Sequence, residues 1–344
     1  MRVLIAGGGP AALASARAYR EAGGDGDITL ITPEAALPYQ RPPLSKDFLR
    51  GDMTEDDLPI EPADWYSRHE VAVLEDEVVD VRDHEVVLRR ETRSFDRLVL
   101  ATGATPKRIG DGLVLRSLAD ARRLRTAAER AGTATVIGSG FIGCEAAASL
   151  AMRGLEVTLV SDEDIPHATR LGEEAGRRIM GFLRELGVAL ELGEQAGATG
   201  GLTLEAVGVE SPRIPVDEHM RSERPDVLAV GDAALAHNAG AGRRLAVEHW
   251  GEALNMGEVA GRVLAGEDAR WDVAPGFWST IGEHTLKYVA WGDGFDEARV
   301  VDHSDGAWTV WYGADGVAVG VLTHERDEDY ERGRALIEAK EPLP

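Results

Sequence analysis

The chain is poor in cysteine. Cys144 is the only one, which excludes an internal disulfide, a Cys-x-x-Cys redox pair and a thiolate metal cage. The nine histidines are scattered without the spacing of metal ligands, so a metal site is not expected. Since disulfides are typical of secreted proteins, this composition indicates a cytoplasmic protein.

Basic residues are also scarce. The sequence has 37 Lys and Arg against 60 Asp and Glu, which gives a formal net charge of -23. Phosphate backbones and anionic lipid headgroups repel a strongly acidic chain. Nucleic acid and membrane surfaces are therefore not expected partners.

Long uninterrupted apolar runs are absent. The stretch from Thr133 to Met152 is nearly long enough to span a bilayer, but Glu145 and a glycine turn interrupt it. The segment after Arg2 has the charge and apolar run of a signal peptide, yet glycines and Pro10 lie where its core must be helical. We expect neither a transmembrane helix nor a signal peptide.

A pattern of strand, glycine turn, helix and strand occurs twice, beginning at Arg2 and again at Thr135. This alternation is typical of α/β layers with parallel sheets. Between the two copies, short β-rich runs predict a meander that returns to the first sheet. These runs are Val71 to Val73, Val78 to Val81, Glu85 to Leu88 and Arg97 to Leu100, and a later strand is expected at Val227 to Val230.

The sequence pattern changes after Pro275, where apolar and polar residues alternate. Such alternation predicts antiparallel strands, and a charged helix from about Glu325 to Lys340 follows them. The region is therefore expected to be an α+β domain. Its predicted strands are Leu286 to Trp291, Ala298 to Val301, Ala307 to Tyr312 and Val317 to Leu322.

The first glycine turn follows the apolar run from Val3 to Ala6 and has the pattern G-x-G-x-x-A. Gly7 permits a tight turn, Gly9 lets the backbone approach a diphosphate, and Ala12 allows close packing of helix on strand. The helix that follows offers free amides and a positive dipole to phosphates. Glu34 lies where an acid accepts hydrogen bonds from an adenosine ribose. A tight turn without a ligand is the alternative for a single motif of this kind.

The motif is repeated near the middle of the chain. Ala134 to Ile137 precede a turn in which all three glycines are present, at Gly138, Gly140 and Gly143, and a helix from Cys144 to Arg153 is expected after it. Two such turns in strand and helix context favour two dinucleotide sites. Two sites in one chain imply a relay in which one nucleotide donates a hydride and the other, tightly held, accepts it.

The second site leaves the choice of nicotinamide nucleotide open. The position that normally carries the ribose acid is Ser161, with Asp162 next to it. Asp162 suits NAD, whereas Ser161 with Arg170 nearby suits the 2′-phosphate of NADP. We favour NADH, with NADPH as the alternative.

At this point the sequence resembles a known group. The segment from Leu37 to Gly51 reads LPYQRPPLSKDFLRG. It is similar to the signature of a group of FAD-dependent pyridine nucleotide oxidoreductases, the oxygenase-coupled NADH:ferredoxin and rubredoxin reductases. This group is the putidaredoxin reductase-like type. RPPLSK is its specific part. Further similar segments occur in family order: Ala101 to Gly103, VIGSGFIGCE, AVGDAA, VEHW and Phe277 to Ser279.

The resemblance implies a fold of two Rossmann-like dinucleotide-binding domains of the glutathione reductase type plus a C-terminal α+β domain. The FAD-binding domain is expected at 1–117 and 218–266. A shortened NAD(P)-binding domain is expected at 118–217 and the C-terminal interface domain at 267–344. Between Val188 and Val216 the chain is shorter than the family pattern, and Glu210 to Pro212 replace its usual Arg-Pro-Asn.

The resemblance also implies the cofactor-binding residues. Those for FAD are Gly7, Gly9, Pro10, Ala11, Glu34, Arg41, Lys46, Val78, Ala101, Thr102, Gly103, Arg116, Gly231, Asp232, Val247, Glu248, His249 and Trp250. Those for the nicotinamide nucleotide are Gly138, Gly140, Phe141, Ile142, Gly143, Glu145, Ser161, Asp162 and Gly208.

Lys46 and Glu145 are the residues to which the resemblance gives a catalytic role. Reduced flavin tends to be anionic, and a buried lysine stabilises such a charge better in a site of low dielectric than in water. Glu145 opposite Lys46 is expected to hold the ammonium in place. A solvated surface lysine and a helix-capping acid are the alternative interpretation.

The resemblance implies a flavoprotein reductase that passes electrons from NAD(P)H through FAD to a one-electron acceptor such as a ferredoxin or rubredoxin. An iron–sulfur protein is expected to dock near Trp278. Thr280 and Ile281 replace the Asp-Gln that usually follows in the family, which leaves a quinone or oxygen reductase open. An NADH-responsive flavoprotein similar to apoptosis-inducing factor, or a nucleotide-binding protein without redox activity, are the remaining alternatives. Cys144 is expected to be a small buried residue.

Overall fold

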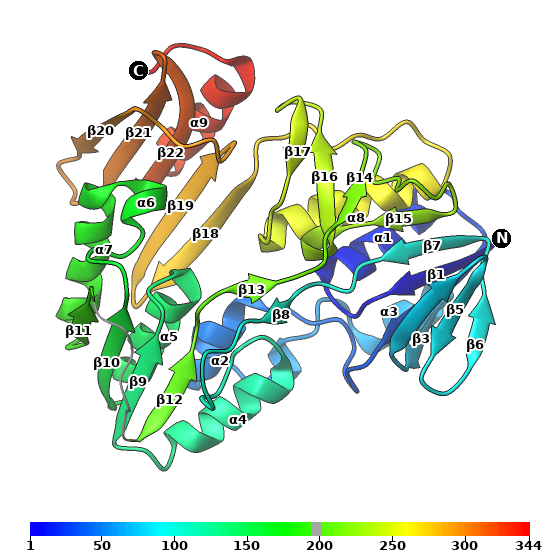
Figure 1. The fold of residues 1–344 in the computed structure, drawn as a ribbon, viewed down its shortest axis with the longest axis horizontal. Coiled ribbons are helices and arrows are strands. Elements are labelled where there is room, and N and C mark those ends of the chain that lie inside the picture. Colours follow the sequence, from blue (N-terminus) through cyan, green and yellow to red (C-terminus); the bar gives the residue numbers. More distant parts are fainter. Residues whose placement is uncertain (194–200) are drawn as a thin grey trace. The chain divides into compact units, whose positions relative to one another are not determined.

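The computed structural model describes residues 1–193 and 201–344. The chain divides into two compact units (Figure 1). The first unit holds residues 1–40, 58–104 and 211–275, and the second holds 41–57, 105–210 and 276–344. Parallel sheets and helices in each unit confirm the predicted α/β class. The domain boundaries stay a prediction, and residues 194–200 of the shortened segment lie outside the described part.

The first unit is built around a five-stranded parallel sheet of order β15-β7-β1-β2-β3. Four of the five residues of β1 are buried. A nearly continuous apolar strand is typical of a parallel sheet that is covered on both faces. The strands are β1 (Arg2–Ala6), β2 (Asp27–Thr32), β3 (Val71–Glu75), β7 (Arg97–Leu100) and β15 (Val227–Ala229).

Helices α1 (Pro10–Glu21) and α8 (Trp250–Leu264) lie side by side in this unit (Figure 1). Gly257 and Gly261 of α8 face the α1 backbone, and a Cβ added at either would lie 2.4 Å from a carbonyl oxygen of α1. Glycine is therefore required at both positions for the helices to approach this closely. Nine of the twelve residues of α1 are buried as a result.

The meander between the two glycine turns differs from the prediction. β3 and β7 do join the first sheet, but residues 78–81 and 85–88 do not. They lie in β4 (Val78–Arg82) and β5 (Glu85–Leu88), which form a separate antiparallel sheet with β6 (Thr92–Ser94). The reason is packing. Val86, Leu88 and Phe95 are buried against Leu4, Ile31 and Leu98 of the first sheet, so the small sheet buries its apolar side chains against that sheet without extending it.

Further elements complete the first unit. They are α3 (Ala63–Arg68), the 3₁₀ turn η3 (Gly231–Ala233) and a three-stranded sheet of β14 (Ile214–Val216), β16 (Ala234–Asn238) and β17 (Arg243–Leu245).

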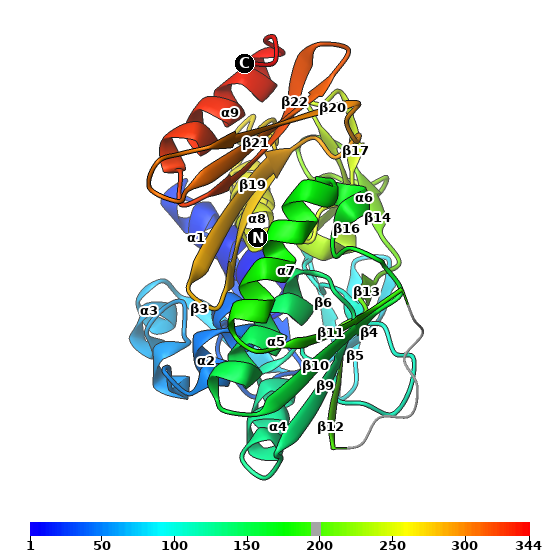
Figure 2. The ribbon, with the colours of Figure 1, turned by 90° about the vertical axis from the view of Figure 1, so that its left-hand side faces the viewer.

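The second unit contains a parallel sheet of order β11-β10-β9-β12. Figure 2 shows α5 and α7 beside it. α5 begins at Phe141 and not at the predicted Cys144, because Gly140 already has the extended backbone of an N-cap. The elements are β9 (Thr133–Ile137), α5 (Phe141–Met152), β10 (Glu156–Ser161), α7 (Glu173–Glu185), β11 (Ala189–Leu192) and β12 (Leu202–Glu205).

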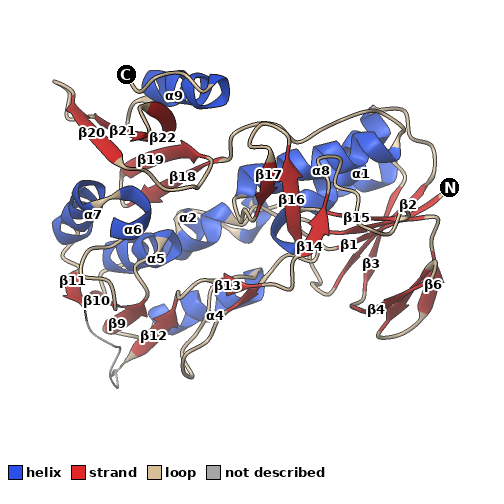
Figure 3. Ribbon diagram, turned by 45° about the horizontal axis from the view of Figure 1, so that its top comes forward, coloured by secondary structure: helices blue, strands red, loops and turns tan. Residues whose placement is uncertain are grey.

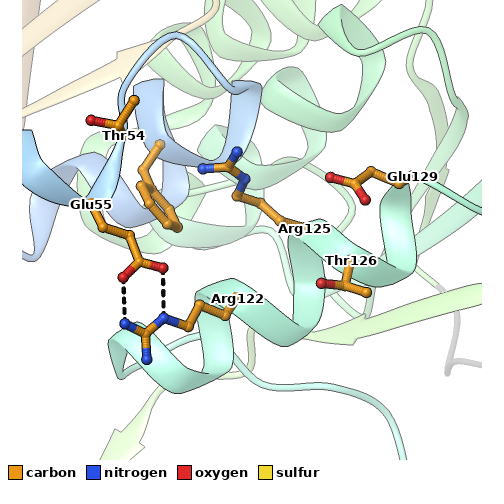
Figure 4. A pocket seen from close by; sticks show the side chains of 7 residues that line it. Thr54, Glu55, Arg122, Arg125, Thr126 and Glu129 are labelled. Atoms are coloured by element: carbon orange, nitrogen blue, oxygen red, sulfur yellow. Dashed lines mark hydrogen bonds and ion pairs between the residues drawn. The ribbon is translucent and has the colours of Figure 1, made fainter. Parts of the chain in front are cut away.

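The same unit contains an antiparallel sheet of order β18-β19-β22-β21-β20, with α9 (Asp327–Ala339) against β22 and β19 (Figure 3). This confirms the predicted mixture of strands and a final helix. β18 was not predicted as a strand. The strands are β18 (Gly276–Ile281), β19 (His284–Ala290), β20 (Glu297–Asp302), β21 (Trp308–Ala314) and β22 (Val317–His324).

Shorter elements complete the second unit. They are η1 (Pro42–Ser45), α2 (Asp47–Arg50), η2 (Glu55–Asp57), β8 (Thr105–Pro106), α4 (Leu118–Ala128), α6 (Ala168–Leu171) and β13 (Val209–Glu210). Among the described residues, no helix combines the length and the apolar character that crossing a membrane requires.

Candidate functional site

The first glycine turn is closed by a backbone contact. Gly7 has a φ of +145°, and a Cβ built on it would lie 2.2 Å from the carbonyl oxygen of Ala101. Its amide donates to Ile31 O at 2.7 Å. Only glycine fits this position. Gly9 is the N-cap of α1 and Pro10 its first residue, so the other first-turn amides of the helix point toward the turn without intrahelical acceptors.

The predicted FAD residues of this unit follow the strands of one parallel sheet. Gly7 follows β1, Glu34 lies two residues past β2, Ala101 follows β7, and Asp232 lies three residues past β15. Because the carboxyl ends of parallel strands meet at one edge, the structure brings these residues to the edge where α/β sheets bind ligands. The Glu34 carboxylate accepts a hydrogen bond from Tyr39 Oη at 2.7 Å.

The other predicted FAD residues of the first unit lie in connecting segments. Val78 is the first residue of β4, and Thr102 and Gly103 continue the chain from Ala101. Val247 to His249 lead into α8, which begins at Trp250. Glu248 is exposed and forms an ion pair with Arg213.

The second glycine turn is closed in the same way. Gly138 has a φ of +106°, and an added Cβ would lie 2.5 Å from Ala206 O. At Gly143 an added Cβ would lie 1.9 Å from Gly138 O, so the helix packs directly on the turn. Gly140 differs, because its added Cβ would meet nothing within 4 Å. The turn is thus closed on the protein side and open at the glycine that a diphosphate approaches, which fits a dinucleotide.

The end of β10 carries an acid that the sequence reasoning missed. The Ser161 hydroxyl is buried and lies 2.7 Å from Ser139 Oγ, inside the glycine turn. The Glu163 carboxylate accepts from Ser139 Oγ and from the amide of His167, each at 3.1 Å. Asp162, the predicted acid, is exposed. The carboxylate hydrogen-bonded to the second turn is therefore that of Glu163.

Aromatic side chains lie beside the second turn. The Phe141 ring lies 4.1 Å from that of His167 and 4.7 Å from that of Phe277. The guanidinium of Arg170 lies 5.1 Å from the Phe277 ring centre, a cation–π contact. Burial, reinforced by the charge of Arg170, lowers the pKa of His167 to about 3.

The other predicted nucleotide residues of the second unit are more open. Ile142 is 42% exposed at the start of α5. Gly208 has a φ of +95°, with open space around the position of an added Cβ.

The Arg41 guanidinium donates to Arg116 O at 2.7 Å. Cys144 is buried as expected, its thiol donates to Ser139 O, and burial raises its pKa.

Lys46 and Glu145 form a buried ion pair, which confirms the predicted pairing and is contrary to a solvated surface lysine. Lys46 Nζ lies 2.8 Å from Glu145 Oε2. Ser45 Oγ donates to the same oxygen at 2.5 Å, and Ser279 Oγ donates to Oε1 at 2.6 Å. All four residues are buried. A buried ion pair requires such additional hydrogen bonds to offset the loss of solvation.

Three residues of these sites were not predicted: Ser45, Ser279 and Glu163. Ser45 lies within RPPLSK and Ser279 ends the Phe-Trp-Ser segment, so the motifs that carry the resemblance already contained them. Glu163 lies two residues past β10 and one residue past Asp162, the acid that the sequence pattern predicts.

Comparison with known proteins adds to this geometry. Residues 1–203 match the family described as pyridine nucleotide-disulphide oxidoreductase. Human apoptosis-inducing factor 3 is 30% identical over 87% of this chain, which spans 56% of the length of that relative. The ferredoxin reductase subunit of 5,5'-dehydrodivanillate O-demethylase from Sphingobium sp. is 30% identical, covering 97% of this chain and 92% of that protein.

A solved structure is similar along almost the whole chain. It is the ferredoxin reductase for the CYP199A2 system from Rhodopseudomonas palustris, with a TM-score of 0.94 and 26% identity. The alignment covers 99% of this chain and 95% of that one.

Proposed function

This chain belongs to the pyridine nucleotide-disulphide oxidoreductase family, and we propose that it is an FAD-dependent reductase that takes electrons from NAD(P)H and passes them singly to a ferredoxin-type protein. The observation that carries the proposal is a cradle that occurs twice, where a cradle means a glycine turn between a strand and the N-terminus of a helix. Two parallel sheets each end in a glycine turn at the N-terminus of a helix. Such a turn binds the diphosphate of a dinucleotide.

The first turn and the residues at the same sheet edge are the proposed FAD site. Gly7, Gly9, Pro10 and Ala11 would hold the diphosphate, and Glu34 the adenosine ribose. The remaining FAD residues are assigned by family resemblance, and they are Arg41, Lys46, Val78, Ala101 to Gly103, Arg116, Gly231, Asp232 and Val247 to Trp250.

When bound, FAD supplies the chemistry of accepting a hydride and releasing electrons one at a time. The chain itself orients the two nucleotides and supplies charge. Lys46 carries the positive charge proposed to lie near the isoalloxazine ring, and its ion pair with Glu145 fixes the ammonium. A fixed cation in a site without bulk water stabilises developing negative charge more than the same cation in water.

NADH is the proposed nicotinamide nucleotide, held by Gly138, Gly140, Phe141, Ile142, Gly143 and Gly208. Glu163 supports this choice, because its carboxylate is hydrogen-bonded to Ser139 of the turn. A carboxylate there would accept hydrogen bonds from the ribose hydroxyls of NAD. It would also repel the 2′-phosphate of NADPH, which carries the same sign of charge.

An iron–sulfur protein is the proposed acceptor. The relatives from Sphingobium and Rhodopseudomonas palustris are named as ferredoxin reductases. Trp278 lies on β18, the first strand of its sheet, and is 45% exposed. An exposed tryptophan is a frequent anchor of protein interfaces, so the docking site is proposed here. The scarcity of cysteine supports a cytoplasmic location.

A second candidate is an NADH-responsive flavoprotein with slow turnover, which the 30% identity to human apoptosis-inducing factor 3 favours. The two functions differ in acceptor dependence. The reductase is expected to turn over rapidly with a ferredoxin and slowly with quinone or dioxygen. Slow turnover with every acceptor, together with a long-lived reduced protein, would favour the second candidate.

The experiment that tests the reductase is anaerobic mixing with NADH. The purified protein is expected to be yellow and to bleach, faster with NADH than with NADPH. Retained yellow colour with both nucleotides would contradict the proposal. Lys46→Ala is expected to slow bleaching by roughly tenfold or more while FAD stays bound. An unchanged bleaching rate would show that Lys46 is wrongly assigned.

A further inference from the structure

Ser279 lies on the face of β18 that meets α5. Phe277, Ser279 and Ile281 alternate with Trp278 and Thr280 along the strand, and Ser279 is fully buried. Alternate residues of a strand point to opposite faces. The hydroxyl of Ser279 therefore points away from the face that exposes Trp278, and it donates to Glu145 Oε1 at 2.6 Å.

The two oxygens of Glu145 are held by different parts of the chain. Oε2 accepts from Ser45 Oγ at 2.5 Å and lies 2.8 Å from Lys46 Nζ. Oε1 accepts from Ser279, 134 residues away in the sequence. Because both oxygens have partners, the carboxylate plane is fixed. Lys46 Nζ also donates to Pro42 O at 3.2 Å. The ammonium therefore has one partner in its own segment, Pro42, and one on α5, Glu145.

Replacing Ser279 by alanine removes only the hydroxyl oxygen, so little packing volume is lost. Its effect is electrostatic. A hydrogen bond to an ionised acceptor is stronger than one between neutral groups, and it is stronger still where burial excludes water. Glu145 is only 4% exposed, so water has little access to replace the lost donor. Without the Ser279 hydroxyl, Oε1 loses this hydrogen-bond donor. The carboxylate can then rotate, and its rotation moves the ammonium of Lys46 that is paired with Oε2.

We propose that Ser279 is a positioning residue for electron transfer, which acts on the reaction by fixing Glu145 and, through it, Lys46. This inference rests on the proposed function. It adds a residue from the antiparallel sheet to a centre otherwise made of the Ser45-Lys46 segment and α5. Ser279 touches neither nucleotide in this scheme, so it alters the rate of flavin reduction and not the affinity for NADH.

The test is stopped-flow reduction of the FAD-bound protein by NADH. Ser279→Ala is expected to lower the rate at saturating NADH by about tenfold, from the loss of one hydrogen bond to a charged group. The NADH concentration that gives the half-maximal rate is expected to change by less than about twofold. Ser279→Cys, which replaces the hydroxyl by a larger group that is still a weak donor, is expected to fall between serine and alanine.

Thr323→Val is the matched control. Thr323 lies in β22 of the same sheet, is 1% exposed, and its hydroxyl has no hydrogen-bond partner among the described residues. Its replacement removes a buried hydroxyl without touching Glu145. The rate is expected to stay within about twofold of the wild type. A fall as large as that of Ser279→Ala would mean that any buried hydroxyl of the sheet matters, and would overturn the inference.

A double-mutant cycle separates positioning from general damage. If Ser279 acts through Lys46, adding Ser279→Ala to Lys46→Met changes the rate by less than about twofold. Effects that multiply, or a wild-type rate in Ser279→Ala, would overturn the inference while leaving the reductase function intact. A wild-type protein that binds FAD but is not reduced by NADH would instead remove the proposed function, and the inference with it.

Discussion

The two glycine turns share the same contact at their first glycine and differ at the third position of the motif. Gly7 and Gly138 each lie against the backbone oxygen of an alanine that follows a neighbouring strand, Ala101 and Ala206 respectively. Both positions therefore exclude a side chain for the same steric reason. At the third motif position, Ala12 in the first turn is fully buried, whereas Gly143 in the second leaves no space for a Cβ.

The helices behind the turns differ as well. α8 packs on α1 along glycines that allow close approach of its backbone, and the first two residues of α1, Pro10 and Ala11, are buried. α5 exposes Ile142 in its first turn, and Gly140 faces open space. A covered cradle suits a cofactor that stays bound, and an open one suits a nucleotide that enters and leaves in each cycle. In the proposed function, the first turn holds the resident FAD and the second holds the nicotinamide nucleotide.

The largest expected effect breaks the first cradle. Gly7→Ala places a Cβ 2.2 Å from Ala101 O at a φ of +145°, which is expected to destabilise the first unit by about 3 kcal/mol or more. The variant should be purified with little or no FAD. The absorbance of FAD relative to protein checks this, and a fully yellow variant would contradict the assignment of FAD to this turn.

Gly143→Ala is expected to impair reduction by NADH and not the binding of FAD. Alanine normally stabilises a helix, but here its Cβ would lie 1.9 Å from Gly138 O. The variant should keep FAD and lose at least about tenfold in the rate of reduction by NADH.

Gly140→Ala is the matched control for Gly143→Ala. Its added Cβ meets no protein atom within 4 Å, so thermal stability should be unchanged while NADH binds more weakly. Loss of FAD from either variant of the second turn would show that the two cradles are not independent sites.

The sequence predicted both cradles because each is a local pattern of small residues between a strand and a helix. It also gave the bounds of β5 and β7 as observed. It did not predict that β4 and β5 leave the first sheet, since alternating apolar residues fit a sheet edge and a covering sheet equally well. The contact between Ser279 and Glu145 spans 134 residues, and local periodicity carries no information on such a pairing.

The ribose acids provide a smaller test of the comparison. Glu34 past β2 and Glu163 past β10 are proposed to have equivalent roles. Glu163→Ser removes the negative charge at the second turn and is expected to raise kcat/KM for NADPH relative to NADH by about tenfold. Asp162→Asn is the control, because Asp162 is exposed, and it should leave the ratio nearly unchanged. A shift with Asp162→Asn alone would return the role to that residue.

A further expected effect concerns acid stability beside the second turn. Burial lowers the pKa of His167 to about 3, below the ordinary value of about 6.5. As the pH falls below about 6.5, the unfolded chain binds a proton at His167 that the folded chain does not. His167 therefore costs up to ~1.4 kcal/mol of stability per pH unit until the pH nears its folded pKa.

His167→Phe removes this contribution. The difference in melting temperature between the variant and the wild type is expected to shift in favour of the variant between pH of about 7 and about 5. Thermal unfolding at the two pH values measures it. A difference that does not change with pH would mean that His167 has the same pKa in the folded and unfolded states.

The most direct test of the assignment of two dinucleotides is a crystal structure of the yellow protein with NAD⁺ added. The account predicts the FAD diphosphate at the amide end of α1, beside Gly9, and the NAD⁺ diphosphate at the amide end of α5, beside Gly140. Either turn filled by side chains, or either nucleotide bound elsewhere on the protein, would contradict it.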